Sequence, residues 1–271
     1  MALIKRFNAY HRVVHVIIAV SFIGLVASGM PLRYAQAPWA AWLMKLMGGY
    51  YAAGLIHRIC AAVTFGYFAA HIGYVLYDVA LVKKFKFNII GPDSMVPWLK
   101  DLEDIYHSFR WFFGKGPRPQ FDRFTYWEKF DYWAVFWGVG MIGVSGLLLW
   151  FPEFFGQFLP GWAFNIATVI HSDEALLAAG FIFTIHFFNT HLRPEKFPMD
   201  LVIFTGRLTL RELQHERPLE YQRLVDENRL DEYRAGSQAT WVTDAGIFFG
   251  FTVVIVGFFL LILIIMGQFI Y

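Results

Sequence analysis

Five long apolar stretches alternate with polar connections along the chain. They cover residues 13–31, 55–82, 132–151, 164–189 and 245–270. A helix of about 20 apolar residues crosses the hydrocarbon core of a bilayer. The pattern therefore predicts an all-α integral membrane protein, with a four-helix transmembrane bundle and a fifth, C-terminal transmembrane helix.

Two of the connections are long. The first contains apolar residues at helical spacing, which predicts an amphipathic helix at about residues 94–113 that lies on the inner membrane face, with Ser94 as its N-cap. These apolar residues are Val96, Leu99, Leu102, Tyr106 and Phe109. The second connection has a charged helical pattern divided by Pro218, and we expect it to be solvated or docked on a partner. The predicted parts are a membrane domain at 1–197, a cytoplasmic connection at 198–243 and a transmembrane helix at 244–271.

Composition and charge placement support this organisation. Hydrophobic residues make up 57% of the chain, whereas soluble domains average about 45–50%. The single cysteine, Cys60, excludes a disulfide framework and a cysteine-bound iron–sulfur cluster. An inner N-terminus places 20 of the 23 Lys and Arg residues on the cytoplasmic side. The positive-inside rule therefore predicts a cytoplasmic N-terminus, a periplasmic C-terminus and a first helix that is retained.

Histidines inside the predicted spans fall at two depths. His57 and His171 lie near the outer face, and His15, His71 and His186 lie near the inner face. The separations of 14 and 15 residues within two of the helices correspond to roughly 21 and 22 Å. Each level can therefore grip one flat macrocycle between two imidazoles. Bis-histidine ligation suits electron transfer and not oxygen binding, so the pattern predicts two haem b groups.

The residues around these histidines have two readings each. Arg58 is expected either to pair with a haem propionate or to extend its side chain to the membrane–water interface without a haem contact. Small residues near the histidines either make room for a ring or let helices pack closely. They include Gly24, Ser28, Gly29, Gly143, Ser145 and Gly146.

Four stretches carry a resemblance to a known family. They are "HVIIAVSFIGLVASGMPL", "LIHRICAAVTFGYFAAHIGY", "RFTYWEKFDYWAVFWGVGMIGVSGLLLWFPE" and "IHSDEALLAAGFIFTIHFF". The chain resembles the membrane cytochrome b subunits of formate dehydrogenases and nickel–iron hydrogenases, and more closely the bacterial proteins related to thiosulfate-reductase b subunits. The resemblance covers residues 10–197, and the fifth helix falls outside it.

The resemblance implies ligands for both haems. His57 and His171 would hold the outer haem, and His15 and His186 the inner haem. The fourth-helix spacing is one residue longer than in the formate dehydrogenase subunits, and His71 is an extra histidine. Geometry alone suggests His71 with His186, so the inner partner stays open between His15 and His71. A third haem, held with His191 or His11, is the less favoured alternative.

The resemblance also implies a quinone site beside the inner haem. The matching stretch is "FTYWEKFDYW", in which Tyr126, Glu128 and Lys129 lie at a suitable depth. Menaquinone or ubiquinone would be the substrate, and a carboxylate could shuttle its protons. The alternative is an interfacial charge cluster at the start of a helix.

The expected function is that of an electron-transfer subunit in the bacterial inner membrane. It would connect the quinone pool with a periplasmic redox partner, either an iron–sulfur protein or a multihaem cytochrome c, in a hetero-oligomeric complex. Catalysis beyond quinone oxidation or reduction, and nucleic-acid binding, are not expected. One alternative is a cytoplasmic partner. Another is a proton transporter with a histidine relay. The histidines are predicted to lie away from the membrane midplane, which argues against this alternative.

Overall fold

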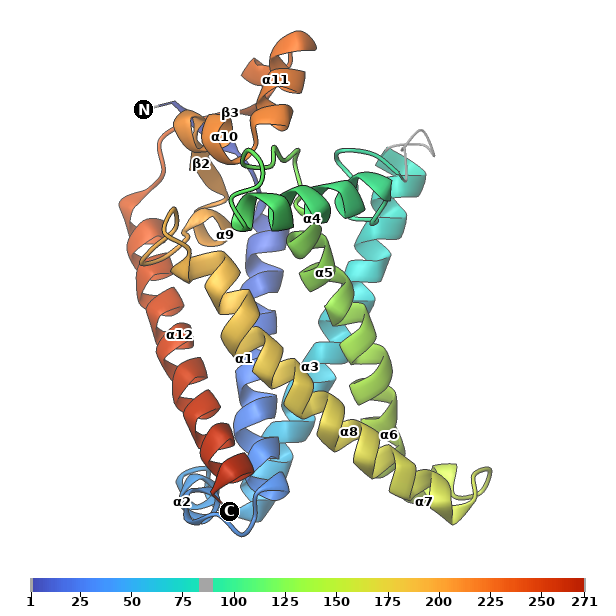
Figure 1. Ribbon diagram of the computed structural model, residues 1–271. Coiled ribbons are helices and arrows are strands. Elements are labelled where there is room, and N and C mark those ends of the chain that lie inside the picture. The colour runs from blue at the N-terminus through green and yellow to red at the C-terminus, as the bar shows by residue number, and fades with distance from the viewer. Residues whose placement is uncertain (1, 83–89, 271) are drawn as a thin grey trace. The chain divides into compact units, whose positions relative to one another are not determined.

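The computed structural model describes residues 2–82 and 90–270 (Figure 1). Residues 83–89, with which the first predicted connection begins, lie outside the described residues. Five helical segments in the described part are long and apolar enough to cross a membrane. They are Ala9–Arg33, Tyr50–Val82, Tyr126–Trp150, Gly161–Leu192 and Thr240–Phe269. The predicted spans and the all-α membrane class are confirmed, and the segments extend a few residues beyond most predicted ends.

Three of these segments are interrupted by π turns. The first and last segments are the single helices α1 (Ala9–Arg33) and α12 (Thr240–Phe269). The others are α3 (Tyr50–Tyr77) with η1 (Asp78–Val82), α5 (Tyr126–Gly138) with η2 (Val139–Gly143) and α6 (Val144–Trp150), and α8 (Gly161–Phe181) with η3 (Ile182–His186) and η4 (Phe188–Leu192). π turns are rare and occur often at functional sites.

Shorter elements form the connections. They are β1 (Leu3–Lys5), α2 (Pro38–Leu46), α4 (Leu99–Phe112), α7 (Pro152–Phe155), α9 (Val202–Thr205), β2 (Arg207–Thr209), α10 (Leu210–Glu216), α11 (Pro218–Asp226), η5 (Leu230–Tyr233) and β3 (Arg234–Ala235). The chain divides into two compact units. One comprises Met1–Arg12, Val75–Ala134 and Leu201–Gly246, and the other Val13–Tyr74, Val135–Asp200 and Ile247–Tyr271.

The first unit contains a small antiparallel sheet in the order β2-β1-β3. The N-terminal strand β1 lies in the centre, where Ile4 pairs with Leu208 on one side and with Arg234 on the other. Ile4 and Leu208 are buried with Leu213 and Leu224 of the two following helices. The second connection, which was expected to be solvated or docked on a partner, therefore packs on the chain's own N-terminus. The predicted division at Pro218 is confirmed, since α10 ends before it and α11 begins with it.

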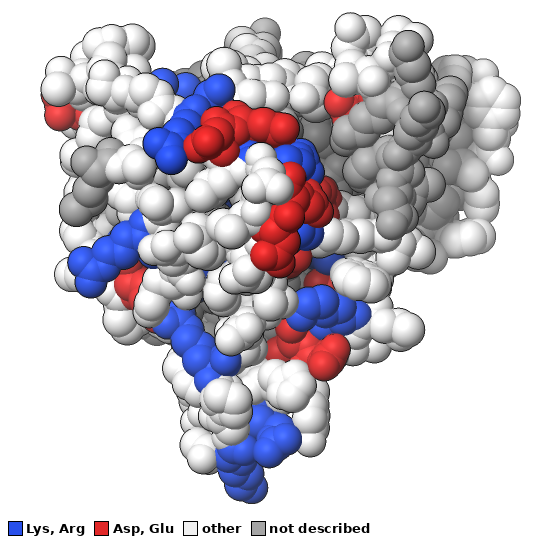
Figure 2. Space-filling view, turned by 90° about the horizontal axis from the view of Figure 1, so that it is seen from above, with Lys and Arg blue, Asp and Glu red and all other residues white. Residues whose placement is uncertain are grey.

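Buried ion pairs join the three segments of this unit. Arg6 and Arg123 both donate to Glu220, each at 2.9 Å. Arg217 donates to Glu128 at 2.9 Å. Burial lowers the pKa of Arg6 to about 10, which leaves it charged at neutral pH. Figure 2 shows how Lys and Arg side chains interleave with Asp and Glu on the face seen from above.

Helix α4 corresponds to the predicted amphipathic helix, but it begins at Leu99 and not near Ser94. The residue before a proline is driven toward extended backbone, so the helix starts only after Pro97. Ser94 instead accepts a hydrogen bond from the Val96 amide at 3.0 Å. The apolar side of α4 is exposed, with Leu99 at 81%, while Asp101 on the opposite side is buried. This polarity suits the predicted place on the membrane face.

Buried residues of α1, α2, α12 and of the segment that runs from α8 through η3 form the core of the second unit (Figure 1). Its buried members include Val26, Met30, Leu43, Phe183, Phe187, Leu260 and Ile264. A Cβ on Gly257 would lie 2.5 Å from the ring of Phe187, so this approach of α12 to α8 requires glycine. Near the other end of α12, the hydroxyl of Tyr34 donates to Gln268 at 2.9 Å. The fifth helix, which lies outside the family resemblance, is therefore integral to this core.

Candidate functional site

Two pairs of histidines face each other in the second unit. His57 of α3 and His171 of α8 have ring centroids 6.1 Å apart, with an angle of 69° between the rings. His15 of α1 and His186, the last residue of η3, have ring centroids 6.5 Å apart, with an angle of 37°. The structure thus brings together the two pairs that the sequence places at the predicted outer and inner levels, and each pair joins two different helices.

Both separations suit a metal ion shared by two imidazoles. A ligating imidazole nitrogen lies about 2.0 Å from a transition metal, and the ring centroid about 1.1 Å further, so opposed rings have centroids about 6.2 Å apart. No cluster of three or more His, Cys, Asp or Glu suited to a metal occurs within residues 2–82 and 90–270. A metal held by either pair would take only two protein ligands. A haem iron held by two axial imidazoles takes this number of protein ligands.

Hydrogen bonds select the nitrogen that each outer imidazole can offer. The Ser28 hydroxyl donates to the Gly24 carbonyl at 2.6 Å, so it accepts from His57 Nδ1 at 3.0 Å. His171 Nδ1 donates to the Ile142 carbonyl at 2.9 Å. In a neutral imidazole with Nδ1 protonated, Nε2 carries the lone pair. Both outer rings therefore present Nε2 for ligation, a tautomer that carbonyl and hydroxyl partners commonly fix in metal sites.

At the inner level the structure pairs His186 with His15. His71 lies edge-on against Phe136, with ring centroids 6.3 Å apart. The π turn η3 ends at His186 and closes its hydrogen bond over one more residue than an α turn. The 15 residues from His171 to His186 therefore include a π turn just before the second histidine. Neither length nor hydropathy signals a π turn, and the sequence analysis did not predict one.

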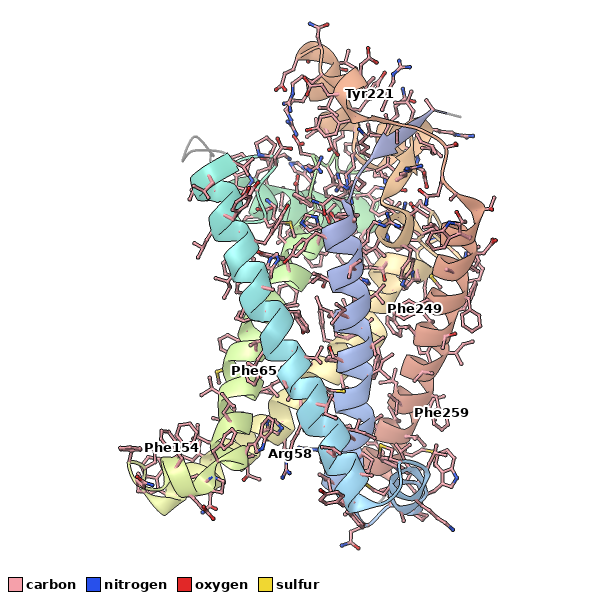
Figure 3. All side chains as sticks on the ribbon, turned by 180° about the vertical axis from the view of Figure 1, so that it is seen from behind. Arg58, Phe65, Phe154, Tyr221, Phe249 and Phe259 are labelled. Carbon is pink, nitrogen blue, oxygen red and sulfur yellow. The ribbon has the colours of Figure 1, made fainter. Side chains whose placement is uncertain are left out.

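The remaining predicted residues have other surroundings. Arg58 lies on α3 with its guanidinium 5.9 Å from the ring of Trp150 (Figure 3). His191 is buried and accepts a hydrogen bond from the Asp200 amide at 3.3 Å. His11 contacts Asn8, with 2.7 Å between Nδ1 and Oδ1.

The predicted quinone residues belong to the first unit. Tyr126 packs against Trp127, and Glu128 accepts from the Thr125 amide and hydroxyl at 2.8 and 2.9 Å. Glu128 also accepts from Arg217 at 2.9 Å, so charged and polar groups surround it at the start of α5. Lys129 is buried and donates to Asp101 at 2.9 Å.

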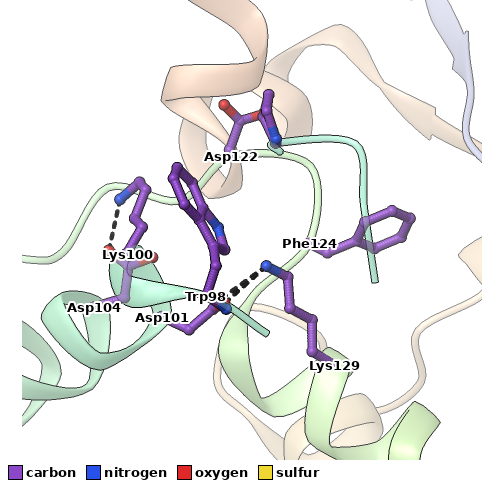
Figure 4. A pocket seen from close by; sticks show the side chains of 8 residues that line it. Trp98, Lys100, Asp101, Asp104, Asp122, Phe124 and Lys129 are labelled. Carbon is purple, nitrogen blue, oxygen red and sulfur yellow. Dashed lines mark hydrogen bonds and ion pairs between the residues drawn. The ribbon is translucent and has the colours of Figure 1, made fainter. Parts of the chain in front are cut away.

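A pocket of about 180 Å³ opens beside Lys129 (Figure 4). Aromatic and charged side chains line it together. They are Trp98, Lys100, Asp101, Asp104, Asp122, Phe124 and Lys129, with Pro92. Burial raises the pKa of the Asp104 carboxyl, which Lys100 partly counteracts by an ion pair at 2.8 Å. The pocket offers proton donors, acceptors and two aromatic faces.

Two acidic residues after His171 tie helices together. Asp173 accepts from Arg33 of α1 at 2.7 Å, and the same arginine donates to Ser172. Glu174 accepts from the indole nitrogen of Trp137 at 3.1 Å. These contacts, like those of Ser28 and Ile142, depend on which helices are neighbours, and no spacing in the sequence pointed to them.

Comparison with known proteins adds one similarity. No family model matches the chain. Over 174 residues, the chain is 25% identical to the cytochrome b556(fdo) subunit of formate dehydrogenase from Escherichia coli strain K12. This match covers 64% of this chain and 72% of that subunit. The corresponding subunits of Escherichia coli O6:H1 and O157:H7 match to the same extent. This similarity supports a membrane cytochrome b subunit of that kind.

Proposed function

We propose that this protein is a di-haem cytochrome b that carries electrons across the bacterial inner membrane. The observation that carries the proposal is the spacing of two histidine pairs, at 6.1 and 6.5 Å between ring centroids. Packed aromatic rings also lie about 4.5–7 Å apart, so a single separation does not decide the matter. Two pairs on apolar helices, with matched separations, favour ligation because imidazoles in a bilayer are costly without a partner.

His57 and His171 would hold the outer haem, and His15 and His186 the inner haem. A haem iron with two axial imidazoles has no open position, so it supplies one-electron transfer. The protein's part is to hold the rings, to fix their tautomers and to exclude water. For the outer pair, the hydrogen bonds to Ser28 and to the Ile142 carbonyl hold the two imidazoles and fix their tautomers. His71 is the alternative inner ligand, and a third haem is not part of the proposal.

The experiment is a measurement of haem content in the purified protein. The pyridine haemochrome assay should give two haem b groups per chain. His57→Ala and His171→Ala should each reduce the haem content to one haem per chain. His107→Ala is the matched control, because His107 lies on α4 next to Glu103, and it should retain both haems. A chain that inserts correctly without haem would refute the proposal.

We further propose that a quinone binds beside Tyr126, Glu128 and Lys129 and exchanges electrons with the haem groups of this protein. The pocket next to Lys129 supports this, because it combines aromatic side chains with groups that can exchange protons. In Tyr126→Ala, haem reduction by a soluble quinol should slow, while reduction by dithionite is unchanged. An equal rate with quinol in both proteins would rule out Tyr126 as a quinone contact.

The redox partner is proposed to lie on the periplasmic side, as an iron–sulfur protein or a multihaem cytochrome c. The supporting observation is the charge asymmetry of the sequence, which puts most basic residues and both long connections inside. Purification of the intact complex from its native membrane tests this. A cytoplasmic redox subunit in that complex would contradict it.

A further inference from the structure

Two Ser-Gly dipeptides lie against the outer histidines in closely similar ways. Ser28 and Gly29 of α1 contact His57, and Ser145 and Gly146 of α6 contact His171. A Cβ on Gly29 would lie 3.2 Å from Cε1 of His57, and one on Gly146 would lie 2.9 Å from Cε1 of His171. Each imidazole therefore packs closely on a helix at a glycine, where an added Cβ would crowd the ring.

The serines complete each contact. Ser28 is buried, and its hydroxyl accepts from His57 Nδ1 at 3.0 Å. Ser145 is also buried, lies 3.5 Å from His171 Nδ1, and donates to the Met141 and Ile142 carbonyls at 2.6 and 3.1 Å. The Ile142 carbonyl is the main acceptor for His171, at 2.9 Å.

The π turn η2 explains how a helix carbonyl can serve this ring. It covers Val139–Gly143, so Ile142 is part of the widened turn. A side chain that inserts beside a helix's hydrogen-bond ladder commonly accompanies such an irregularity. Here the inserted group is the imidazole of His171, which Gly146 admits one turn further along.

We infer that the two Ser-Gly dipeptides are the positioning elements of the outer haem, and that the Ser28 hydroxyl sets its redox potential through His57. This inference rests on the proposed function. An acceptor on Nδ1–H increases the basicity of the imidazole, and a more basic ligand stabilises the ferric state. Removal of the acceptor should therefore raise the midpoint potential of the outer haem. The inner haem, which His15 and His186 would hold, should not respond.

The experiment is a potentiometric titration of the full-length protein. In Ser28→Ala the outer haem should titrate at a higher potential with the inner haem unchanged, and Ser28→Thr, which keeps the hydroxyl, should restore the wild-type value. Ser21→Ala is the control, because Ser21 is also buried on α1 but donates to the Ile18 carbonyl. If Ser28→Ala loses the outer haem, its retention in Ser28→Thr supports the inference and its loss there overturns it.

A second pair of variants tests the glycines. Gly146→Ala should reduce the affinity for the outer haem, whereas Gly66→Ala, where an added Cβ meets nothing within 4 Å, should leave it unchanged. An unchanged outer potential in Ser28→Ala, or an equal shift in Ser28→Ala and Ser28→Thr, overturns the role of the hydroxyl. Those outcomes leave both haems bound, whereas failure of the proposed function would leave none.

Discussion

The sharpest prediction concerns the inner haem, for which the sequence offers two ligands. In the structure the ring of His15 lies 6.5 Å from that of His186, within about 0.3 Å of the separation expected for two imidazoles on one metal. His71 instead contacts Phe136. We therefore expect His15→Ala to lose the inner haem and His71→Ala to keep it.

The size of the effect follows from the ligand's role. Loss of a group that only orients a metal ligand costs about 10–100-fold in affinity, so loss of the ligand itself costs more. The haem-to-protein ratio of His15→Ala should fall from two to one, and the remaining haem should keep the potential of the outer site. His71→Ala should retain two haems.

The assay combines the pyridine haemochrome ratio with a redox titration of each purified variant. The titration identifies which haem remains, because the His57→Ala variant provides the reference with only the inner haem. Two haems in His15→Ala together with one in His71→Ala would refute the reasoning and assign the inner ligand to His71. One haem in both variants would also contradict it.

Three further predictions concern packing and charge. Gly257→Leu should lower the free energy of unfolding in detergent by about 1–3 kcal/mol, because the new side chain overlaps Phe187. The melting temperature should fall accordingly, and an unchanged value would contradict this packing. Lys129→Met should cost about 3–5 kcal/mol by leaving Asp101 buried and unpaired, and the double variant with Asp101→Leu should recover most of the loss, whereas additive losses would argue against the pair. Burial raises the pKa of Asp104 in the folded state above 3.8. The free energy of unfolding of the wild type, relative to that of Asp104→Asn, should therefore be highest at low pH and fall as the pH rises through the folded-state pKa. A difference between the two proteins that does not depend on pH would contradict this prediction.

The sequence alone determined the membrane class, the five spans and the two depths of the histidines. Apolar runs of this length predict membrane-spanning helices, because the thickness of the hydrocarbon core sets how many residues a helix needs to cross it. Depth follows from the rise per residue, so the levels of His57 and His171, or of His15 and His186, could be read before any helix was placed. The similarity to a cytochrome b subunit supports the membrane class.

Contacts between distant segments had no such local signal. Strand β1 has three residues, too few for a periodic pattern, and it became a strand only because β2 and β3 pair with it. The ion pair of Glu128 with Arg217, 89 residues away, has no signal in the sequence around either residue. The Ser28 and Ile142 acceptors likewise depend on which helices are neighbours.

The choice between His15 and His71 illustrates the same division. Both are predicted to lie at the inner level, and from the sequence the spacing favours His71 whereas the family resemblance favours His15. Only the tertiary structure decided which one faces His186, because facing depends on the rotation of each helix about its axis and on the π turn that rotates His186. A chain's local pattern determines how deep a side chain lies, whereas the packing of whole helices determines what it meets there.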